Sequence, residues 1–195
     1  MLLSDVLNEL EQLNLRKNTL IIFASDNGAA IQAPIKILNC NAGFKGRKGT
    51  LYEGGIRVPF IVNQPGMVPI QTLDNLIYFP DMMPTLAALA KGTKHLPKQI
   101  NGINILPLFY GKQVDTDNRL LYWEFPGKQR AARKGDWKCV TIHPNQPLEL
   151  YNLKEDPEET NNLAKKYPRR VKEFDEEMQR MHIPTPNWPQ PGEQF

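Results

Sequence analysis

The stretch Leu20-Ile21-Ile22-Phe23-Ala24-Ser25-Asp26-Asn27-Gly28 decides the fold class of this 195-residue chain. Its apolar part has the length and the β-branched and aromatic content of a strand that is buried on both faces. The apolar run stops abruptly at an acid, an amide and a glycine. Because ligands of open α/β sheets bind just beyond the carboxyl ends of the strands, this ending predicts a site at Asp26 and Asn27.

Asp26 and Asn27 place a carboxylate oxygen and an amide oxygen side by side. Hard oxygen donors of this kind suit Ca²⁺ or Mg²⁺ better than a soft metal. Asp-Asn-Gly is also a common turn sequence, so this segment alone leaves both interpretations open.

A second segment, Gly43-Phe44-Lys45-Gly46-Arg47-Lys48-Gly49-Thr50-Leu51-Tyr52-Glu53-Gly54-Gly55-Ile56-Arg57, has the composition of a binding loop. Its glycines allow close backbone approach and positive φ, so the loop can fold tightly around something small. Its cations can reach an anion, and an apolar strand follows from Val58 to Val62.

The two segments together resemble the second half of the catalytic domain of type I sulfatases, a family that includes the arylsulfatases and the glycosaminoglycan sulfatases. Further segments are similar to family motifs and follow in the family order: Phe79–Ala90, Asn101–Leu108 (with Asn101 in place of an Asp), Arg130–Lys138 and Leu150–Leu163. The resemblance covers roughly residues 1–181.

The resemblance implies an α/β fold that is the C-terminal part of an alkaline-phosphatase-like sulfatase fold. Over residues 1–110 we expect a partial mixed sheet with flanking helices, mostly parallel, because a helix at 3–14 leads into a strand at 19–24. A further helix is expected from Leu76 to Leu89, with Leu86 and Leu89 against the sheet. Over residues 111–195 we expect a small antiparallel subdomain with a C-terminal helix and a Pro-rich tail. Its elements are expected at 119–125, 129–133, 137–142, 148–153 and within 157–181.

In the sulfatase interpretation, Asp26 and Asn27 are metal ligands and donate oxygens to a divalent cation, most often Ca²⁺ in the family. Lys48 occupies the lysine position of the Gly-x-Lys-Gly-Thr motif and is the catalytic and substrate-binding residue, since its ammonium would hold a sulfate oxygen. Glu53 and Arg57 flank the Gly-Gly turn and are expected to brace the loop. Lys45 and Arg47 match no family role and are expected to face solvent.

The centre of the family's active site has no counterpart in the sequence. The nucleophile there is a formylglycine, made from the first residue of a Cys/Ser-x-Pro-Ser-Arg motif, whereas Cys40 is followed by Asn-Ala and Cys139 by Val-Thr. The paired N-terminal aspartates that complete the metal site are also missing. We therefore expect a C-terminal portion that depends on the missing N-terminal half as its partner and is inactive in isolation.

Two other function classes stay open. Phosphonate and phosphate monoesterases share the fold and the Asp-Asn metal pair, and Thr in place of Cys or Ser at the upstream nucleophile would favour them. The third class is a non-catalytic remnant or binding module. The sequence does not specify the substrate, which is a sulfated sugar or another sulfated small molecule such as an aryl sulfate.

Composition and the family resemblance limit the kinds of partner and the cellular location to be expected. Twenty-four basic and 21 acidic residues give a formal charge of +3, which is too mild to predict binding to nucleic acid. No segment has the length of a membrane span. Relatives act mostly in periplasm, lysosome or medium, so the resemblance implies an extracytoplasmic location. Cys40 and Cys139 form no metal motif, and a disulfide between them stays open beside two idle thiols. His143 is isolated and matches no catalytic histidine of the family.

Overall fold

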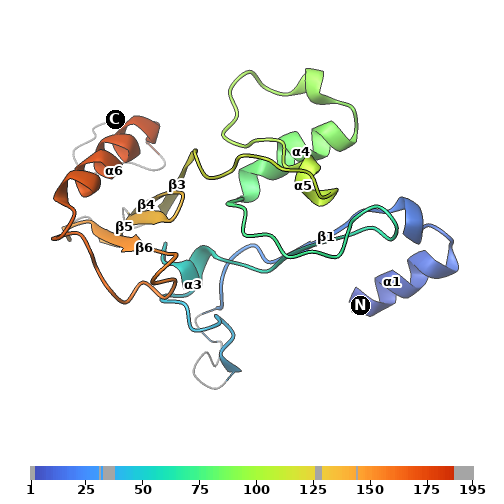
Figure 1. Cartoon of the computed structure of the whole chain (residues 1–195), viewed down its shortest axis with the longest axis horizontal. Coiled ribbons are helices and arrows are strands. Elements are labelled where there is room, and N and C mark those ends of the chain that lie inside the picture. Colours follow the sequence, from blue (N-terminus) through green and yellow to red (C-terminus); the bar gives the residue numbers. More distant parts are fainter. Residues whose placement is uncertain (1–2, 31, 33–37, 126–128, 144, 187–195) are drawn as a thin grey trace. The chain divides into compact units, whose positions relative to one another are not determined.

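The chain forms two compact units that alternate along the sequence (Figure 1). The computed structural model describes residues 3–30, 32, 38–125, 129–143 and 145–186. Unit 1 comprises Met1–Ala24 and Pro59–Thr116, and unit 2 comprises Ser25–Val58 and Asp117–Phe195. We expected one boundary, near residue 110. Each of these units instead combines two separate stretches of the chain. Residues 25–58 therefore pack with the C-terminal part of the chain.

Unit 1 begins with α1 (Leu3–Gln12), which confirms the helix predicted at 3–14. The one-turn helix η1 (Arg16–Asn18) leads into β1 (Ile21–Ala24). β1 pairs with β2 (Phe60–Asn63), with Ile21 opposite Asn63 and Ala24 opposite Phe60.

The strand pair of unit 1 corrects one expectation, because β1 and β2 are antiparallel and not parallel. They are the only strands of unit 1 in the described part of the chain. A helix followed by a strand in the sequence predicts that β1 exists, but it does not predict which strand pairs with β1 or in which direction. Nor is β1 buried on both faces. Its Ile22 packs on the cluster of Ile105, Leu108 and Phe109, while Phe23 on the opposite face is 45% exposed.

The helix expected from Leu76 begins only at Met82. The preceding residues form the one-turn helix η2 (Phe79–Asp81), and α4 runs over Met82–Leu89. Asp81 sets this start, because its carboxylate accepts hydrogen bonds from the backbone N–H groups of Tyr78 at 3.0 Å and Ile103 at 2.9 Å.

The buried face of α4 also differs from the expectation. Leu86 and Leu89 are 45% and 40% exposed, while Thr85 is buried and its Oγ1 accepts a hydrogen bond from the Ile105 N–H at 2.9 Å. Apolar residues surround most of this helix, so the sequence pattern did not select the correct face. The one-turn helix η3 (Thr93–His95) and the short α5 (Leu106–Phe109) complete unit 1.

Unit 2 contains the predicted small antiparallel sheet. Its four strands lie in sequence order: β3 (Leu120–Phe125), β4 (Gln129–Lys134), β5 (Trp137–Thr141) and β6 (Glu149–Asn152). Each boundary lies within one residue of its prediction. The tight turn between β4 and β5 uses Gly135 at φ +54°, a conformation that glycine adopts without a Cβ penalty.

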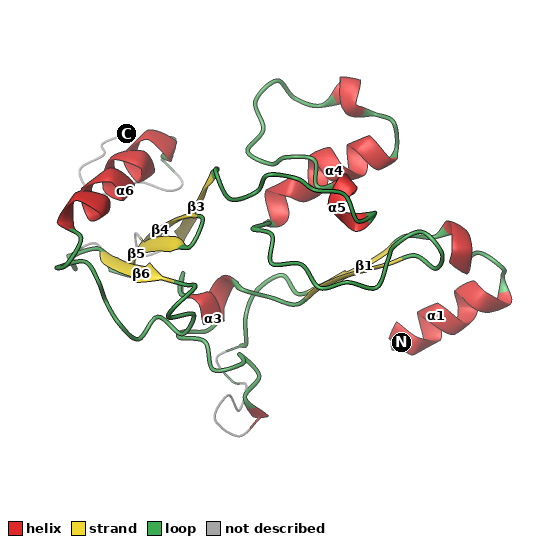
Figure 2. Ribbon diagram, viewed as in Figure 1, coloured by secondary structure: helices red, strands yellow, loops and turns green. Residues whose placement is uncertain are grey.

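Helix α6 (Pro168–Met181) covers one face of this sheet (Figure 2). Pro168 stands in its first turn, where proline is tolerated. Phe174 and Met178 of α6 pack there against Ala132, Cys139 and Leu150 of the sheet. The end of the predicted Pro-rich tail, residues 187–195, lies outside the described residues.

The other face of the sheet carries the glycine-rich segment. Leu51 and Tyr52 of that segment pack against Ala131, Val140 and Tyr151 of the sheet, and the short helix α3 (Glu53–Ile56) follows directly. Thus the segment that carries Lys48 is anchored on the small sheet of unit 2 through Leu51 and Tyr52. In the described portion, no helix has both the length and the apolar character needed to cross a bilayer.

Candidate functional site

Asp26 and Asn27 lie two and three residues beyond the end of β1, in a bend that belongs to unit 2. Asp26 is exposed and Asn27 is half-buried. The Ser25 hydroxyl donates a hydrogen bond to the Asn27 carbonyl oxygen at 2.8 Å, which fixes the backbone around the two candidate metal ligands.

Gly28 joins this bend to helix α3. Its N–H donates to the Gly55 carbonyl oxygen at 2.9 Å. A Cβ added at Gly28 would lie 1.9 Å from the Gly54 carbonyl oxygen, so no larger residue fits without movement of the backbone. The bend that carries Asp26 and Asn27 is thereby seated directly on α3.

The loop that carries Lys48 is wound around the same two glycines of α3. A Cβ at Gly54 would lie 2.6 Å from the Lys45 carbonyl oxygen, and one at Gly55 would lie 2.1 Å from the Thr50 carbonyl oxygen. The Gly54 N–H donates to the Lys45 carbonyl oxygen at 2.7 Å. The sequence predicted that this loop folds tightly around something small. In the structure the loop folds around the backbone of Gly54 and Gly55.

A backbone hydrogen bond links the two candidate ligand-binding segments. The Lys48 N–H donates to the Ala29 carbonyl oxygen at 2.9 Å, three residues after Asp26. Lys48 is exposed. The structure thus brings the Lys48 loop and the Asp26-Asn27 bend together on α3, with Asp26 and Lys48 both open to solvent.

Asp26 and Asn27 fit part of a hard-cation site. Both donors are oxygens, and both sit on a fixed bend at the end of a strand. Within the ranges that the structure describes, no group of three or more His, Cys, Asp and Glu side chains is placed to hold a metal ion. Since Ca²⁺ takes six to eight oxygen ligands, these two residues would supply only a fraction of its shell.

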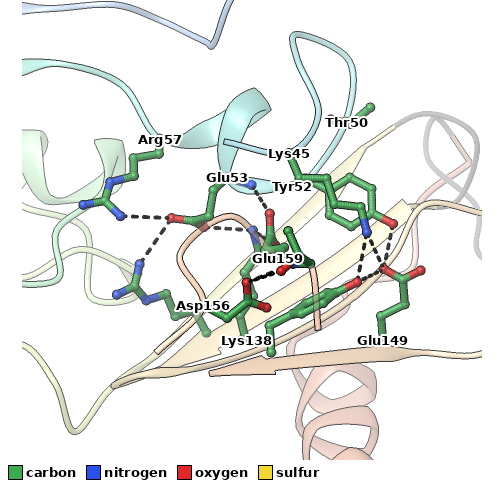
Figure 3. Close-up of polar contacts among 12 residues, drawn as sticks. Lys45, Thr50, Tyr52, Glu53, Arg57, Lys138, Glu149, Asp156 and Glu159 are labelled. Carbon is green, nitrogen blue, oxygen red and sulfur yellow. Dashed lines mark hydrogen bonds and ion pairs between the residues drawn. The ribbon is translucent and has the colours of Figure 1, made fainter. Parts of the chain in front are cut away.

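A buried charge cluster at Glu53 is the feature that the sequence analysis missed (Figure 3). The Lys138 Nζ lies 2.9 Å from Glu53 Oε1 and 2.9 Å from Glu159 Oε1, and all three side chains are at most 3% exposed. Glu159 also accepts a hydrogen bond from the Glu53 backbone N–H at 2.6 Å. One signal was present in the sequence. Lys138 is two residues from the apolar Val140 on β5, so both side chains point to the same, buried face of the sheet, where a charged residue is unusual.

Two arginines complete the environment of Glu53. Arg133 Nη1 lies 3.6 Å and Arg57 Nη1 lies 3.8 Å from Glu53 Oε2. The guanidinium of Arg57 also lies 4.7 Å from the centre of the Phe44 ring. These contacts bear out the expectation that Glu53 and Arg57 brace the loop.

Burial shifts the pKa values of this cluster. Loss of hydration raises the pKa of Glu159 above its ordinary value, although Lys138 and the Glu53 N–H act in the opposite direction. Burial likewise lowers the pKa of Arg133, with Glu53 opposing. Glu159 Oε1 has no aligned hydrogen-bond donor, so its 2.9 Å contact with Lys138 is an ion pair without a hydrogen bond.

A second polar cluster corrects the expectation that Lys45 faces solvent (Figure 3). Its Nζ donates to the Tyr151 hydroxyl at 3.0 Å, lies 3.4 Å from Glu149 Oε2 and sits 4.1 Å from the centre of the Tyr52 ring. The Tyr52 and Tyr151 hydroxyls donate to Glu149 Oε2 at 2.7 and 2.6 Å. Lys45 was misassigned because Glu149 and Tyr151, which bind its ammonium, lie 104 and 106 residues away along the chain. Arg47 is exposed, as expected.

The electrostatics of this second cluster follow from those bonds. Burial by itself raises the pKa of Glu149, but the hydroxyls of Tyr151 and Tyr52 and the Lys45 ammonium outweigh it, and the pKa lies below its ordinary value. The pKa values of Tyr52 and Tyr151 are raised, first by burial and then by their bonds to Glu149.

The cysteines and His143 make no catalytic arrangement in the described chain. Cys40 is exposed, Cys139 is buried, and both are free thiols, so the open alternative of a disulfide is not realised. His143 is exposed, and its Nδ1 accepts a hydrogen bond from the Asn145 N–H at 3.3 Å within a turn.

The chain is similar to known proteins over most of its length. A family model described as Sulfatase matches residues 1–93. A "Sulfatase" of Formosa agariphila is 32% identical over 188 residues, which span 84% of this chain and 33% of the relative. The N-acetylgalactosamine-6-O-sulfatase of Bacteroides thetaiotaomicron is 30% identical over 196 residues, 89% of this chain and 38% of the relative. The chain therefore spans about a third of the length of these relatives.

A solved structure agrees with these relatives. A Bacteroides thetaiotaomicron protein, solved in work on the metabolism of multiple glycosaminoglycans, superposes with a TM-score of 0.80 at 29% identity. The superposition covers 91% of this chain and 41% of that protein. This similarity confirms the predicted α/β fold class.

Proposed function

Because the chain belongs to the sulfatase family, we propose that it supplies metal-binding and sulfate-binding residues to an active site that hydrolyses sulfate esters. One observation carries the proposal. The two segments that match the family's binding motifs are seated on one short helix and joined by the hydrogen bond from the Lys48 N–H to the Ala29 carbonyl oxygen.

The proposed roles follow from the chemistry of the donors. Asp26 and Asn27 would hold a divalent cation, Ca²⁺ or Mg²⁺, which supplies Lewis-acid stabilisation and orientation when bound. Lys48 would hold a sulfate oxygen with its compact ammonium and offset the charge that develops on the leaving oxygen. Glu53 and Arg57 would act on the loop and not on the substrate.

The remaining parts of such a site are proposed to come from an N-terminal half. Its contribution would be the formylglycine nucleophile and the other metal ligands. The relatives are about three times as long as the matched region, which supports this proposal. By analogy with the relatives we also propose an extracytoplasmic setting.

Sulfated sugars are the substrate class that we propose. The support comes from the similarity to an N-acetylgalactosamine-6-O-sulfatase and to a protein studied for glycosaminoglycan metabolism. In such substrates the tetrahedral sulfate group would meet the Lys48 ammonium, while loops outside this chain contribute to sugar recognition.

A binding experiment tests the role of Lys48. The purified chain is titrated with inorganic sulfate and followed by NMR at the backbone amides of residues 45–50. We expect shifts that saturate in the wild type and in Lys134→Ala, which removes an exposed lysine from the end of β4, and that vanish in Lys48→Ala. Shifts that survive Lys48→Ala would refute this role. Tighter binding of phosphate than of sulfate would favour the phosphate or phosphonate monoesterase alternative.

A parallel experiment tests the metal ligands and the activity. Ca²⁺ should shift the amides around Asp26 weakly, and Asp26→Ala should abolish these shifts. Assayed with an aryl sulfate and Ca²⁺, the chain alone should stay at background, because losing the nucleophile removes most of the acceleration that such parts achieve together. If the chain alone turns over the aryl sulfate and Lys48→Ala abolishes that turnover, the proposal that the nucleophile comes from an N-terminal half is wrong.

A further inference from the structure

The charge cluster at Glu53 is an inefficient way to stabilise a fold. Removing charges from water carries a penalty that their mutual attraction often fails to recover, and apolar residues of similar volume frequently do as well. Here an ammonium and two carboxylates are enclosed at exposed fractions of at most 3%. The arrangement is also directional at Glu53, which donates a hydrogen bond to Glu159 through its N–H and accepts one from Lys138 through its side chain.

The contacts of the cluster converge on the first residue of α3. Glu53 is held twice: its backbone N–H donates to Glu159 at 2.6 Å, and its side chain accepts from Lys138 at 2.9 Å. Lys138 is the second residue of β5 and is paired on both sides, with Arg133 of β4 and Tyr151 of β6, so it cannot move without the sheet. Figure 3 shows how Glu53 and Glu159 meet at Lys138.

Glu159 is itself held in a costly conformation. Its φ is +56°, in the left-handed region that disfavours residues with a Cβ. The surrounding turn is fixed by Asp156, whose carboxylate accepts hydrogen bonds from the N–H groups of Thr160 at 3.0 Å and Asn161 at 2.8 Å. Strain of this kind persists only where neighbouring contacts determine the backbone.

Helix α3 transmits this position to Lys48. The loop before it encloses the Gly54 and Gly55 peptides without room for a Cβ, and the Lys48 N–H is bonded to Ala29 in the bend that rests on the same glycines. The lysine side chain is long, exposed and flexible, so its backbone sets where the ammonium is available. Small displacements of a binding group are costly for catalysis.

We infer that Lys138 and Glu159 are positioning residues for the sulfate-binding loop. Together with Glu53 they form a clamp that fixes α3 against the small sheet and, through α3, fixes the backbone of Lys48. The inference rests on the proposed sulfate-binding role of Lys48. Neither Lys138 nor Glu159 touches the substrate.

The test uses the whole chain and two independent readouts. One is the dissociation constant for inorganic sulfate, measured by NMR. The other is the hydrogen-exchange rate of the Lys48 and Gly54 amides. The clamp variants are Lys138→Met, which keeps the length of the side chain, and Glu159→Gln, which keeps an acceptor for the Glu53 N–H but removes the charge. The matched control is Met178→Ala, which opens the core on the opposite face of the sheet.

We expect both clamp variants to speed exchange of the Lys48 and Gly54 amides by about tenfold or more and to weaken sulfate binding several-fold. Met178→Ala should lower the unfolding temperature while both readouts stay as in the wild type. If Lys138→Met does not fold, the milder Glu159→Gln decides the matter.

The outcomes separate this inference from the proposed function. Sulfate binding and amide exchange that are unchanged in folded clamp variants would overturn the clamp and leave the role of Lys48 intact. A wild-type chain without Lys48-dependent sulfate binding would instead overturn that role, and amide exchange alone would then decide whether the clamp fixes the loop. If Met178→Ala changes sulfate binding and amide exchange as much as the clamp variants do, the effect comes from general destabilisation of the core. That result would also refute the inference.

Discussion

At the scale of single residues, Glu149 shows how a carboxylate acquires its environment from distant parts of the chain. Its Oε2 accepts hydrogen bonds from two tyrosine hydroxyls and lies 3.4 Å from the Lys45 ammonium. These groups favour the ionised carboxylate and the protonated phenols. The cluster is therefore strongest where the carboxyl is charged and both tyrosines are neutral.

The cluster predicts how stability depends on pH. Because the pKa of folded Glu149 is depressed, its contribution is present above the unfolded value of about 4.3 and is lost as the pH falls through the folded value. The raised tyrosine pKa values have the opposite sign: their contribution is present below about 10 and lost as the pH rises. Glu149→Gln should cost about 1 kcal/mol of unfolding free energy at pH 7, a low value because the site is partly exposed.

Denaturant midpoints measured at pH 3, 7 and 9 check this prediction. The difference between wild type and Glu149→Gln should shrink at pH 3 and persist at pH 7 and 9. Glu176→Gln is the control, since its ion pair with Lys172 is exposed and should contribute little at any pH. A difference as large at pH 3 as at pH 7 would contradict the assignment.

The two thiols should differ sharply in reactivity. Burial raises the pKa of Cys139 to about 12 and removes it from solvent, whereas Cys40 is exposed. An alkylating reagent at pH 8 should modify one thiol rapidly in the native chain and the second only after unfolding. Cys40→Ser should abolish the rapid phase. A native chain with two fast thiols would argue against the packing of α6 on the sheet.

At the scale of elements, helix α3 depends on close backbone contact. Gly28→Ala would push a Cβ to 1.9 Å from the Gly54 carbonyl oxygen, so the bend or the helix must shift. We expect a loss of about 2–3 kcal/mol in unfolding free energy and faster exchange of the Lys48 amide. Gly92→Ala is the matched control, because its nearest neighbouring atom would lie at 3.8 Å. Equal stability of the two variants in denaturant would refute the close approach.

The elements of unit 2 were predictable, whereas the strand pairing and helix packing of unit 1 were not. Short alternating runs separated by turn residues predicted all four strands of the small sheet, because strand period and turn chemistry are local properties. The direction of β1 against β2 and the buried face of α4 depend on tertiary packing, which local patterns do not encode. The same limit hid the contacts of Lys138 and Lys45, whereas Asp26, Asn27 and Lys48 were found because their motifs are contiguous. Their ligand-binding roles stay predictions.

At the scale of the whole molecule, unit 1 exposes much apolar surface. Its large exposed side chains include Phe23, Ile61, Phe79, Met83 and Leu86, each at least 45% exposed. Apolar surface of this extent on a globular unit marks an interaction face or an aggregation hazard. We expect the purified chain to bind a hydrophobic dye strongly and to self-associate as its concentration rises.

Charged substitutions test that expectation. Phe23 and Ile61 are opposite each other on the uncovered face of the strand pair. Phe23→Lys combined with Ile61→Lys should reduce dye fluorescence and self-association with little effect on the unfolding midpoint. Val62→Lys, on the face that packs against Phe109, is the destabilising comparison. A wild-type chain that binds no dye and stays monomeric would show that this surface is covered in solution.

The clamp at Glu53 also has a consequence for synthesis. The bond from the Glu53 N–H to Glu159 spans 106 residues of sequence, with Lys138 supplied 85 residues after Glu53. At translation rates of about 5–20 residues per second, the Lys48 loop leaves the ribosome roughly 5–20 seconds before its anchors exist. During that interval the glycine-rich segment lacks the contacts that fix Glu53 to the small sheet. The order of translation therefore delays the final geometry of this loop until Lys138 and Glu159 have both been synthesised.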